Sequence, residues 1–428
     1  MKNITLMLIF LIIAFQSKGQ TTNKPQTSKK RLNFAKTYFE LGGRYAPAFS
    51  GKRSIANQVQ TFEHSATFNP YLSWGGFHFW GKAEFYVTFP LNQLRINHSE
   101  ETNFEMNQSV VTGARFFPWR YREGRIRPYF GLSWSAMDFK QIIEPTDNQP
   151  SLVKDFLLIP DMGLLYGYKN FALRLGVNYT HENKWQYPIT KTRFEKIETP
   201  KFNFQIGLMY AFENSHHKKP EVNEKWNNYP GFSKPSHSAT RFGDFFIGVG
   251  PSSSFSLQKS TYNQQNFPYL RDQLSSNGYF DIAAGYQFNQ ANLFTALSFR
   301  NPSFETSGYE TTQKIQKTSI ALEINKYVTD YSGFAPYIGL NVAYDQIKYS
   351  EKTEQGSRER TYEKIEPGIT FGWDIIPGKM DEALILRTNL RWYPLSSFNV
   401  EGQKFNFSQL EYNLIQLVFY PGRLLNNK

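Results

Sequence analysis

Apolar residues alternate with small or polar residues along most of the chain, and the alternation is most regular from 202 to 212. One face of this segment is entirely large and apolar: Phe202, Phe204, Ile206, Leu208, Tyr210 and Phe212. Successive side chains of a β-strand point to opposite faces, so the pattern predicts a strand with one wholly apolar face. A tilted strand of about ten residues crosses the hydrocarbon of a bilayer, and we therefore expect a transmembrane strand.

The same alternation predicts eight strands in each half of the chain. In the first half they are expected at 39–45, 62–74, 77–89, 104–116, 126–134, 156–164, 171–177 and 202–212. In the second half they are expected near 244–255, 278–288, 293–300, 317–327, 335–346, 364–376, 383–393 and 408–420. In the first half, short connections (74–76, 118–124, 168–170) alternate with long polar ones (47–61, 91–103, 141–152, 182–200). Short periplasmic turns alternating with long outer loops are typical of an up-and-down membrane barrel, which would have its N-terminus in the periplasm.

The two halves resemble each other, and a polar segment separates them. Pro128-Tyr129-Phe130-Gly131-Leu132 returns as Pro336-Tyr337-Ile338-Gly339-Leu340, 208 positions later. Residues 213–241 show no periodicity and are rich in polar residues, as a linker would be. We therefore divide the chain into a signal peptide (1–19), a first eight-strand β-barrel unit (20–212), a periplasmic linker (213–241) and a second eight-strand unit (242–428).

The predicted fold is all-β, an antiparallel transmembrane barrel protein with about 16 strands arranged as two tandem eight-stranded barrels. A single 16-stranded barrel is the alternative, and the difference matters because sixteen strands enclose an aqueous channel whereas eight do not. Strand pairing distinguishes the two: the strand at 38–45 would pair either with 202–212 or with the last strand of the chain.

The N-terminus predicts export. A short basic start is followed by the apolar run Ile4 to Phe15, and Ser17-Lys18-Gly19 puts small residues before Gln20. This is the pattern of a cleaved signal peptide, and the run is too short for a membrane-spanning helix. We expect the mature protein to reside in the outer membrane of a Gram-negative bacterium, embedded in its lipid.

Composition agrees with a barrel. Aromatic residues make up 17% of the chain, with 39 Phe and 26 Tyr, and a membrane barrel uses them on its lipid-facing band and its interfacial girdles. The absence of Cys excludes a disulfide framework. The formal net charge is +12, but the Lys and Arg residues are scattered, with no basic helix or basic-aromatic motif. We therefore expect no nucleic-acid partner.

Two motifs resemble those of known families. The 202–212 strand, which ends in Tyr210-Ala211-Phe212, resembles the C-terminal signal of outer-membrane barrels. The Pro-Tyr-x-Gly-Leu pentapeptides are similar to a strand start common in small outer-membrane β-barrel families of Gram-negative bacteria. The resemblance implies a duplicated eight-strand unit and insertion by the outer-membrane barrel assembly machinery. It does not specify an activity, because these families include adhesins, structural barrels, pores and a few lipid-modifying enzymes.

Charged residues recur on the inward faces of the predicted strands. They are Glu40, Arg44, Glu84, Glu105, Arg115, Asp161 and Arg174 in the first unit, and Glu323, Asp345, Glu366, Asp374, Arg387 and Arg391 in the second. Charges inside a protein must be paired to be tolerated, so we expect acids and cations to form an interior network that plugs each barrel. A water-filled channel lined by the same residues is the alternative.

Nothing in the sequence predicts catalysis. His64-Ser65 and His98-Ser99 are immediate neighbours, which would point to opposite faces of a strand and make poor dyads. We assign no catalytic, cofactor or metal-binding residues and expect no enzyme. The function most compatible with the sequence is a structural or surface-interaction role, in which the long outer loops meet an unknown extracellular partner. A passive pore for small solutes is the second possibility, and a lipid-modifying barrel enzyme is a distant third.

Overall fold

The computed structural model describes residues 36–55, 58–94, 96, 104–141, 153–181, 183–188, 190–212, 242–257, 260–270, 274, 276, 278–328, 334–375 and 383–425. The expected signal peptide (1–19) and linker (213–241) lie outside these residues. Among the described residues no helix is long and apolar enough to cross a membrane.

Eight antiparallel strands close into the first ring. In order around the ring they are β1 (Lys36–Ala46), β4 (Thr67–His78), β5 (Ala83–Pro90), β7 (Val111–Phe116), β8 (Ile126–Gln141), β9 (Val153–Tyr168), β10 (Phe171–Tyr179) and β13 (Phe202–Phe212). The first strand pairs with the last, from Thr37 opposite Phe212 to Tyr45 opposite Phe204. Closure gives every strand a hydrogen-bonded neighbour on both sides, which a β-structure needs inside lipid.

A second ring of eight strands closes in the same way. In order they are β14 (Gly243–Ser256), β15 (Tyr279–Phe288), β16 (Leu293–Arg300), β18 (Thr311–Tyr327), β19 (Phe334–Thr353), β20 (Gly356–Ile375), β21 (Leu384–Tyr393) and β24 (Gln409–Phe419). Its first strand, β14, pairs with its last, β24. The strand at 38–45 thus pairs with 202–212 and not with the end of the chain, so the strands form two rings instead of a single larger one.

The outside of the rings is apolar, as lipid requires. On β13 the six large apolar residues of one face are between 37% and 55% exposed, whereas Gln205 and Met209 on the other face are 5% and 0% exposed. The same division holds on β10, where Leu173 and Leu175 are exposed and Arg174 is buried. Apolar side chains outside and polar ones inside are the arrangement of a transmembrane β-barrel.

The tight turn between β4 and β5 does not lie at 74–76, where the sequence predicted it. Residues 74–76 lie inside β4, and the turn falls at Phe79–Lys82, where Phe79 and Trp80 have φ of 55° and 57°. Gly75 is a strand residue, and glycine is needed at this position because a Cβ there would lie 2.5 Å from the Tyr38 hydroxyl inside the lumen. The turn was missed because its left-handed positions are held by aromatic residues, which rarely adopt positive φ.

Short elements extend the rings at one end. Two hairpins, β2 (Phe49–Ile55) with β3 (Gln58–His64) and β11 (Lys184–Pro188) with β12 (Phe194–Glu198), lie within the long connections of the first ring. β6 (Phe104–Gln108) pairs with the outer part of β8, and the 3₁₀ helix η2 (Asn92–Leu94) follows β5.

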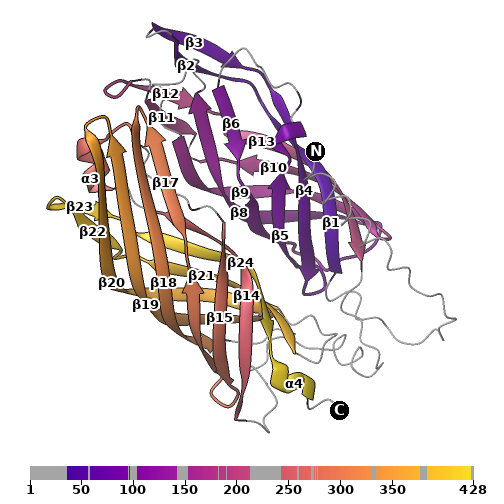
Figure 1. Cartoon of the computed structure of the whole chain (residues 1–428). Coiled ribbons are helices and arrows are strands. Elements are labelled where there is room, and N and C mark those ends of the chain that lie inside the picture. The colour runs from indigo at the N-terminus through magenta and orange to yellow at the C-terminus, as the bar shows by residue number, and fades with distance from the viewer. Residues whose placement is uncertain are drawn as a thin grey trace, which may run out of the picture.

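The second ring has comparable additions: α3 (Thr261–Asn266), β17 (Ser303–Gly308) and the hairpin of β22 (Ser397–Val400) with β23 (Gln403–Asn406). The short helix α4 (Pro421–Leu425) follows β24 and lies at the opposite end of the ring (Figure 1). The two strands expected near 335–346 and 364–376 extend toward each other well beyond these bounds. β19 and β20 remain paired as far as Thr353 and Gly356, because the polar residues of this segment still form a complete backbone ladder beyond the ring.

The repeated motifs occupy matching places. Pro128 to Leu132 lies on β8 and Pro336 to Leu340 on β19, each the fifth strand of its ring. Tyr129 and Tyr337 of the two motifs both point inward, and each is 1% exposed. Leu173-Arg174-Leu175 and Leu386-Arg387-Thr388 lie on the seventh strands, β10 and β21.

The two rings stand side by side (Figure 1), with β2–β3, β11–β12, β22–β23 and α3 at one end of the pair. Phe85 on β5 stacks on Phe334 of β19, with ring centroids 5.3 Å apart. Farther along the same face Trp134 on β8 meets Tyr412 on β24. We call the end that bears the hairpins the outer end, following the orientation expected from the sequence.

Candidate functional site

A layer of paired charges crosses the middle of the first lumen. Arg174 on β10 is fully buried and contacts two carboxylates, with its Nε 3.1 Å from Glu40 Oε2 and its Nη2 2.6 Å from Glu84 Oε1. Glu40 also accepts a hydrogen bond from the Tyr71 hydroxyl at 2.8 Å, and Glu84 accepts one from Tyr38. A Cβ at Gly207 would lie 2.0 Å from Glu40 Oε1, so glycine on the neighbouring strand makes room for this carboxylate.

A second arginine extends this layer to the other side of the lumen. Arg115 on β7 lies 3.1 Å from Glu84 through Nη1 and 2.6 Å from Asp161 through Nε. Its guanidinium also lies over the Tyr86 ring, 3.7 Å from the centroid. The layer therefore links side chains of β1, β5, β7, β9 and β10 across the ring. Two arginines hold three carboxylates, which is the pairing that buried charge requires.

The inner end of the first lumen is closed by apolar side chains. Their buried members are Tyr38, Phe77, Tyr86, Phe117, Tyr129, Leu165, Ala172 and Met209. Arg127 covers this cluster, with its guanidinium 4.2 Å from the Phe117 ring centroid and its Nη1 donating to the Gly81 carbonyl at 2.8 Å.

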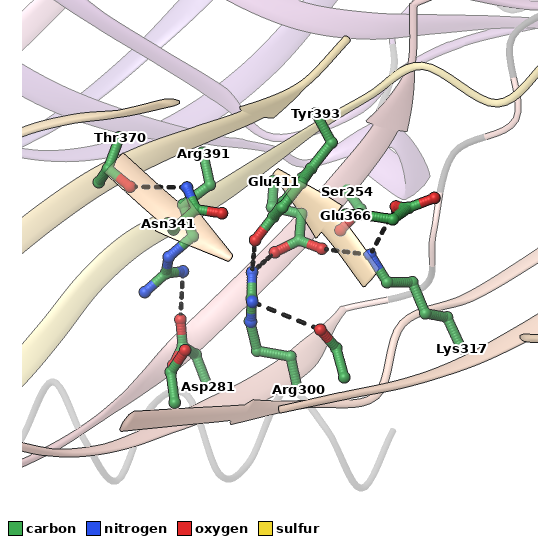
Figure 2. Close-up of polar contacts among 12 residues, drawn as sticks. Ser254, Asp281, Arg300, Lys317, Asn341, Glu366, Thr370, Arg391, Tyr393 and Glu411 are labelled. Atoms are coloured by element: carbon green, nitrogen blue, oxygen red, sulfur yellow. Dashed lines mark hydrogen bonds and ion pairs between the residues drawn. The ribbon is translucent and has the colours of Figure 1, made fainter. Parts of the chain in front are cut away.

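Three of the buried cations in the second lumen are drawn in Figure 2. Arg391 on β21 contacts Asp281 at 2.5 Å and Glu323 at 2.7 Å. Arg300 on β16 donates to the Tyr393 hydroxyl at 2.8 Å and forms an ion pair with Glu411. All of these side chains are buried.

Lys317 on β18 is the third of these cations. Its Nζ lies 2.8 Å from Asp345, 3.2 Å from Glu411 and 4.0 Å from Glu366. Glu366 also accepts a hydrogen bond from the Ser396 hydroxyl at 2.5 Å. A single ammonium therefore faces three carboxylates inside the ring.

Nearer the inner end, Arg387 on β21 contacts Asp374 at 2.7 Å and lies over the Phe294 ring at 3.9 Å from the centroid. Asp374 also accepts a hydrogen bond from Tyr327 at 2.5 Å. Arg387 lies on the same strand as Arg391, and its pair with Asp374 of β20 extends the chain of charges along the lumen.

The charged residues expected from the sequence are mostly found in these layers. Arg44 points inward but has no ion pair among the described residues. Glu105 lies on β6, outside the ring, and its side chain is not among those described.

Three charged residues of these layers were not expected from the sequence: Arg300, Lys317 and Glu411. Arg300 and Lys317 lie at the ends of predicted strands, where alternation is short and weak. The inward position of Glu411 could not be read from the alternation because β24 contains a β-bulge. Arg387 of β21 pairs with Gln416 and Asn389 with Asn413, so β24 has one more residue than β21 between these two pairs. The extra residue shifts the alternation along β24. Odd-numbered residues point inward before the bulge and even-numbered residues point inward after it.

Ordered side chains also cover the outer mouths. Above the first ring, apolar residues of both hairpins pack on the outer part of β9. They are Phe62 of β3, Trp185 of β11 and Ile197 of β12, and their partners on β9 are Leu157 and Ile159. Above the second, Tyr262 of α3 and Phe398 and Phe405 of the β22–β23 hairpin pack with Ile347 and Tyr349 of β19. We call these two groups the first cap and the second cap.

The segments that bear the two caps touch each other. Lys191 of the first unit forms an ion pair with Glu354, in the turn between β19 and β20. The Tyr309 hydroxyl donates to the Pro188 carbonyl at 3.2 Å, and Phe194 packs against Tyr269 and Tyr309. The outer ends of the two rings therefore form one continuous surface.

Ion pairs on this surface are partly exposed. Lys52 of β2 lies 3.2 Å from Glu195 of β12, joining the two hairpins of the first cap, and it holds the pKa of Glu195 below the usual value. Glu354 likewise has a lowered pKa, because Lys191 donates a hydrogen bond to it.

Among the described residues, no group of three or more His, Cys, Asp or Glu side chains has an arrangement that could hold a metal ion. His64, which precedes Ser65, stacks on Phe49 with ring centroids 4.7 Å apart, and its Nδ1 lies 2.9 Å from the Ser65 carbonyl oxygen. His98 lies outside the described residues.

No protein-family model matches the chain, and no curated protein matches it. Among solved structures it is similar to Neisserial surface protein A, at 14% identity and a TM-score of 0.30, over 42% of this chain and 99% of that one. It is similar to Ail, the attachment invasion locus protein of Yersinia pestis, at 14% identity and a TM-score of 0.27, again over 42% and 99%. It is also similar to the outer-membrane protein OmpT of Vibrio cholerae, at 7% identity and a TM-score of 0.18, over 90% and 97%. Likeness this distant says nothing of a role.

Proposed function

We propose that this chain is an outer-membrane protein of a Gram-negative bacterium that acts through its outer surface, as a structural or surface-interaction protein, and does not conduct solutes. In this proposal the two rings arose by duplication of an eight-strand unit, and the barrel assembly machinery inserts them. The proposal includes no enzymatic activity.

The lipid-facing exterior supports the membrane part of the proposal. Closed β-rings with exposed apolar residues such as Leu208 and Leu340 need a hydrocarbon environment. The N-terminal segment has the features of an export signal, which agrees with the outer membrane.

The observation that carries the proposal is the filled lumen. Arg174 and its partner carboxylates bridge opposite sides of the first ring, and apolar clusters lie on both sides of this layer. An eight-stranded ring is just wide enough for side chains to fill. The second lumen is filled by the Arg391, Arg300 and Lys317 groups below its cap. These arrangements favour two plugged barrels over a pore.

The joined caps support the surface role. Their contacts, such as Tyr309 to Pro188, combine the loops of both barrels into one platform, which is larger than either barrel would offer to a partner. The platform exposes charged side chains of both signs, among them Lys52, Arg193, Lys348 and Glu359.

Planar-bilayer recording tests the plugged-barrel proposal. We expect the purified full-length chain to give no stable conductance steps. An Arg174→Ala variant that remains folded should also lack the large open steps of a porin, because the second lumen and both caps are unaffected. Large, stable steps from the unmodified chain would overturn the proposal in favour of a pore.

Single-cysteine labelling tests the outer surface, and the natural chain has no Cys to interfere. On intact cells, a membrane-impermeant maleimide should label Gln355→Cys, at the exposed tip between β19 and β20. The matched control, Asn170→Cys, lies in the tight turn between β9 and β10 and should be labelled only after the outer membrane is permeabilised. If intact cells were labelled at Asn170→Cys and not at Gln355→Cys, the caps would face the periplasm, and the proposed surface role would be ruled out.

A further inference from the structure

The first lumen holds a cavity between its charge layer and its cap, with a volume of about 50 Å³. It lies at the outer ends of the ring strands, and its polar lining includes Arg44, Asn69, Tyr71, Asn178 and Asn203. The volume is several times what a single water molecule needs. Pro90 and Asn92 at its edge are partly exposed, so the cavity is not sealed.

Among the described residues, Arg44 is the only cation that lines this cavity. Its Nη1 donates to Gln108 Oε1, whereas its Nε is buried without a hydrogen bond to any residue that the structure describes. The carboxylates of the layer beneath are already held, Glu40 by Arg174 and Asp161 by Arg115. Arg44 is half-buried, and no carboxylate among the described residues forms an ion pair with it, so its guanidinium is suited to an anion supplied from outside.

Asn69 provides the second recognition element. It lies opposite Arg44 on the neighbouring strand, and its amide nitrogen donates to the Thr67 hydroxyl at 3.1 Å. Its Oδ1 is buried and has no partner among the described residues. Arg44 Nε can donate a hydrogen bond and Asn69 Oδ1 can accept one. A ligand that uses both atoms needs an anionic group and, close to it, a hydrogen-bond donor.

We propose that this cavity binds a small carboxylate bearing a hydroxyl or amino group, such as a hydroxy acid. The carboxylate lies against the Nε edge of Arg44, where a guanidinium forms charge-assisted hydrogen bonds, and the donor lies against Asn69 Oδ1. The Tyr71 ring, 5.7 Å from the Arg44 guanidinium, forms part of the lining, and its hydroxyl is turned away to Glu40. This binding goes beyond the surface role and does not depend on it.

Isothermal titration of the full-length chain in detergent micelles tests the proposal. Lactate should bind, acetate should bind more weakly because it lacks the hydroxyl, and methyl lactate should not bind because it is neutral. Inorganic phosphate should bind more weakly than lactate. Phosphate binding more tightly than lactate would overturn the carboxylate assignment.

Two variants locate the binding. Arg44→Gln should weaken lactate binding about tenfold or more, as expected for loss of a charge-assisted contact. Asn69→Asp keeps the side-chain shape but puts a carboxylate opposite Arg44, so it should abolish binding in a chain that still folds. The matched control Arg193→Gln removes an exposed cation of the first cap and should leave binding unchanged. No binding of lactate to the natural chain, or equal binding by folded Asn69→Asp, would overturn the proposal.

Discussion

The ring of Trp134 on β8 meets the ring of Tyr412 on β24 edge-on, with centroids 5.5 Å apart and planes at 84°. Tyr412 points away from its own lumen, yet only 5% of it is exposed, because the first ring covers it. The Tyr412 hydroxyl is also hydrogen-bonded to the Thr112 side chain of β7. Lipid gives apolar surfaces no hydrophobic reason to associate, so packing and hydrogen bonds of this kind hold two barrels together.

A double-mutant cycle should detect this contact. Trp134→Ala and Tyr412→Ala should each lower the free energy of unfolding in detergent, and the double variant should lose less than the sum. We expect a coupling energy of about 0.5–1.5 kcal/mol, the usual value for an edge-to-face aromatic pair. Trp119→Ala, at an exposed position, paired with Tyr412→Ala should be additive. Additivity in both cycles would mean that the rings do not pack here.

Removing the central cation of the first lumen should be costly. Arg174→Ala leaves Glu40 and Glu84 short of a buried partner, and we expect the free energy of unfolding to fall by about 3–5 kcal/mol. Arg193→Ala removes an arginine that is 58% exposed and paired with Glu195, and it should cost about 1 kcal/mol or less. Urea unfolding followed by tryptophan fluorescence compares the two. Equal small losses would indicate that water reaches the Arg174 layer.

Charge on the lipid face should impair insertion. Leu208 is 55% exposed on the outside of β13, so Leu208→Arg places an arginine in hydrocarbon at a cost of about 2–4 kcal/mol near the bilayer midplane. Leu208→Phe keeps the face apolar and is the control. Folding into lipid vesicles, assayed by the gel mobility of the folded barrel, should fall for the arginine variant alone. Equal folding of both variants would mean that Leu208 does not face lipid.

The first cap should loosen in acid. Lys52 lowers the pKa of Glu195, so the ion pair stabilises the cap fully above the ordinary glutamate pKa of about 4.5 and loses this effect as the pH falls through the lowered value. We expect amide hydrogen exchange across β11 and β12, corrected for intrinsic rates, to accelerate in that range. Lys52→Met should remove most of the pH dependence. If hydrogen exchange in Lys52→Met kept the same pH dependence, a titratable group other than Glu195 would be responsible for it.

Alternation along the chain predicted the strands of the second half closely. Strands expected near 278–288 and 293–300 are β15 (Tyr279–Phe288) and β16 (Leu293–Arg300), and their lipid-facing residues follow the expected phase. A membrane imposes this pattern locally, because each outward side chain meets lipid whatever its partner strand. Local geometry also explains the failures: the turn at Phe79–Lys82 has no glycine at its first two positions, and the bulge in β24 hid Glu411.

The sequence by itself determined that strands alternate between lipid and lumen, that acids and cations face inward, and that two similar halves follow each other. It did not determine how the strands close or which charges meet. Pairing of β1 with β13 and the approach of Lys317 to Glu411, 94 positions away, depend on the tilt and stagger of strands around a ring. The cavity at Arg44 and the contact of Trp134 with Tyr412 were likewise decided only by the tertiary structure, because each joins residues from separate strands whose relative heights no local pattern encodes.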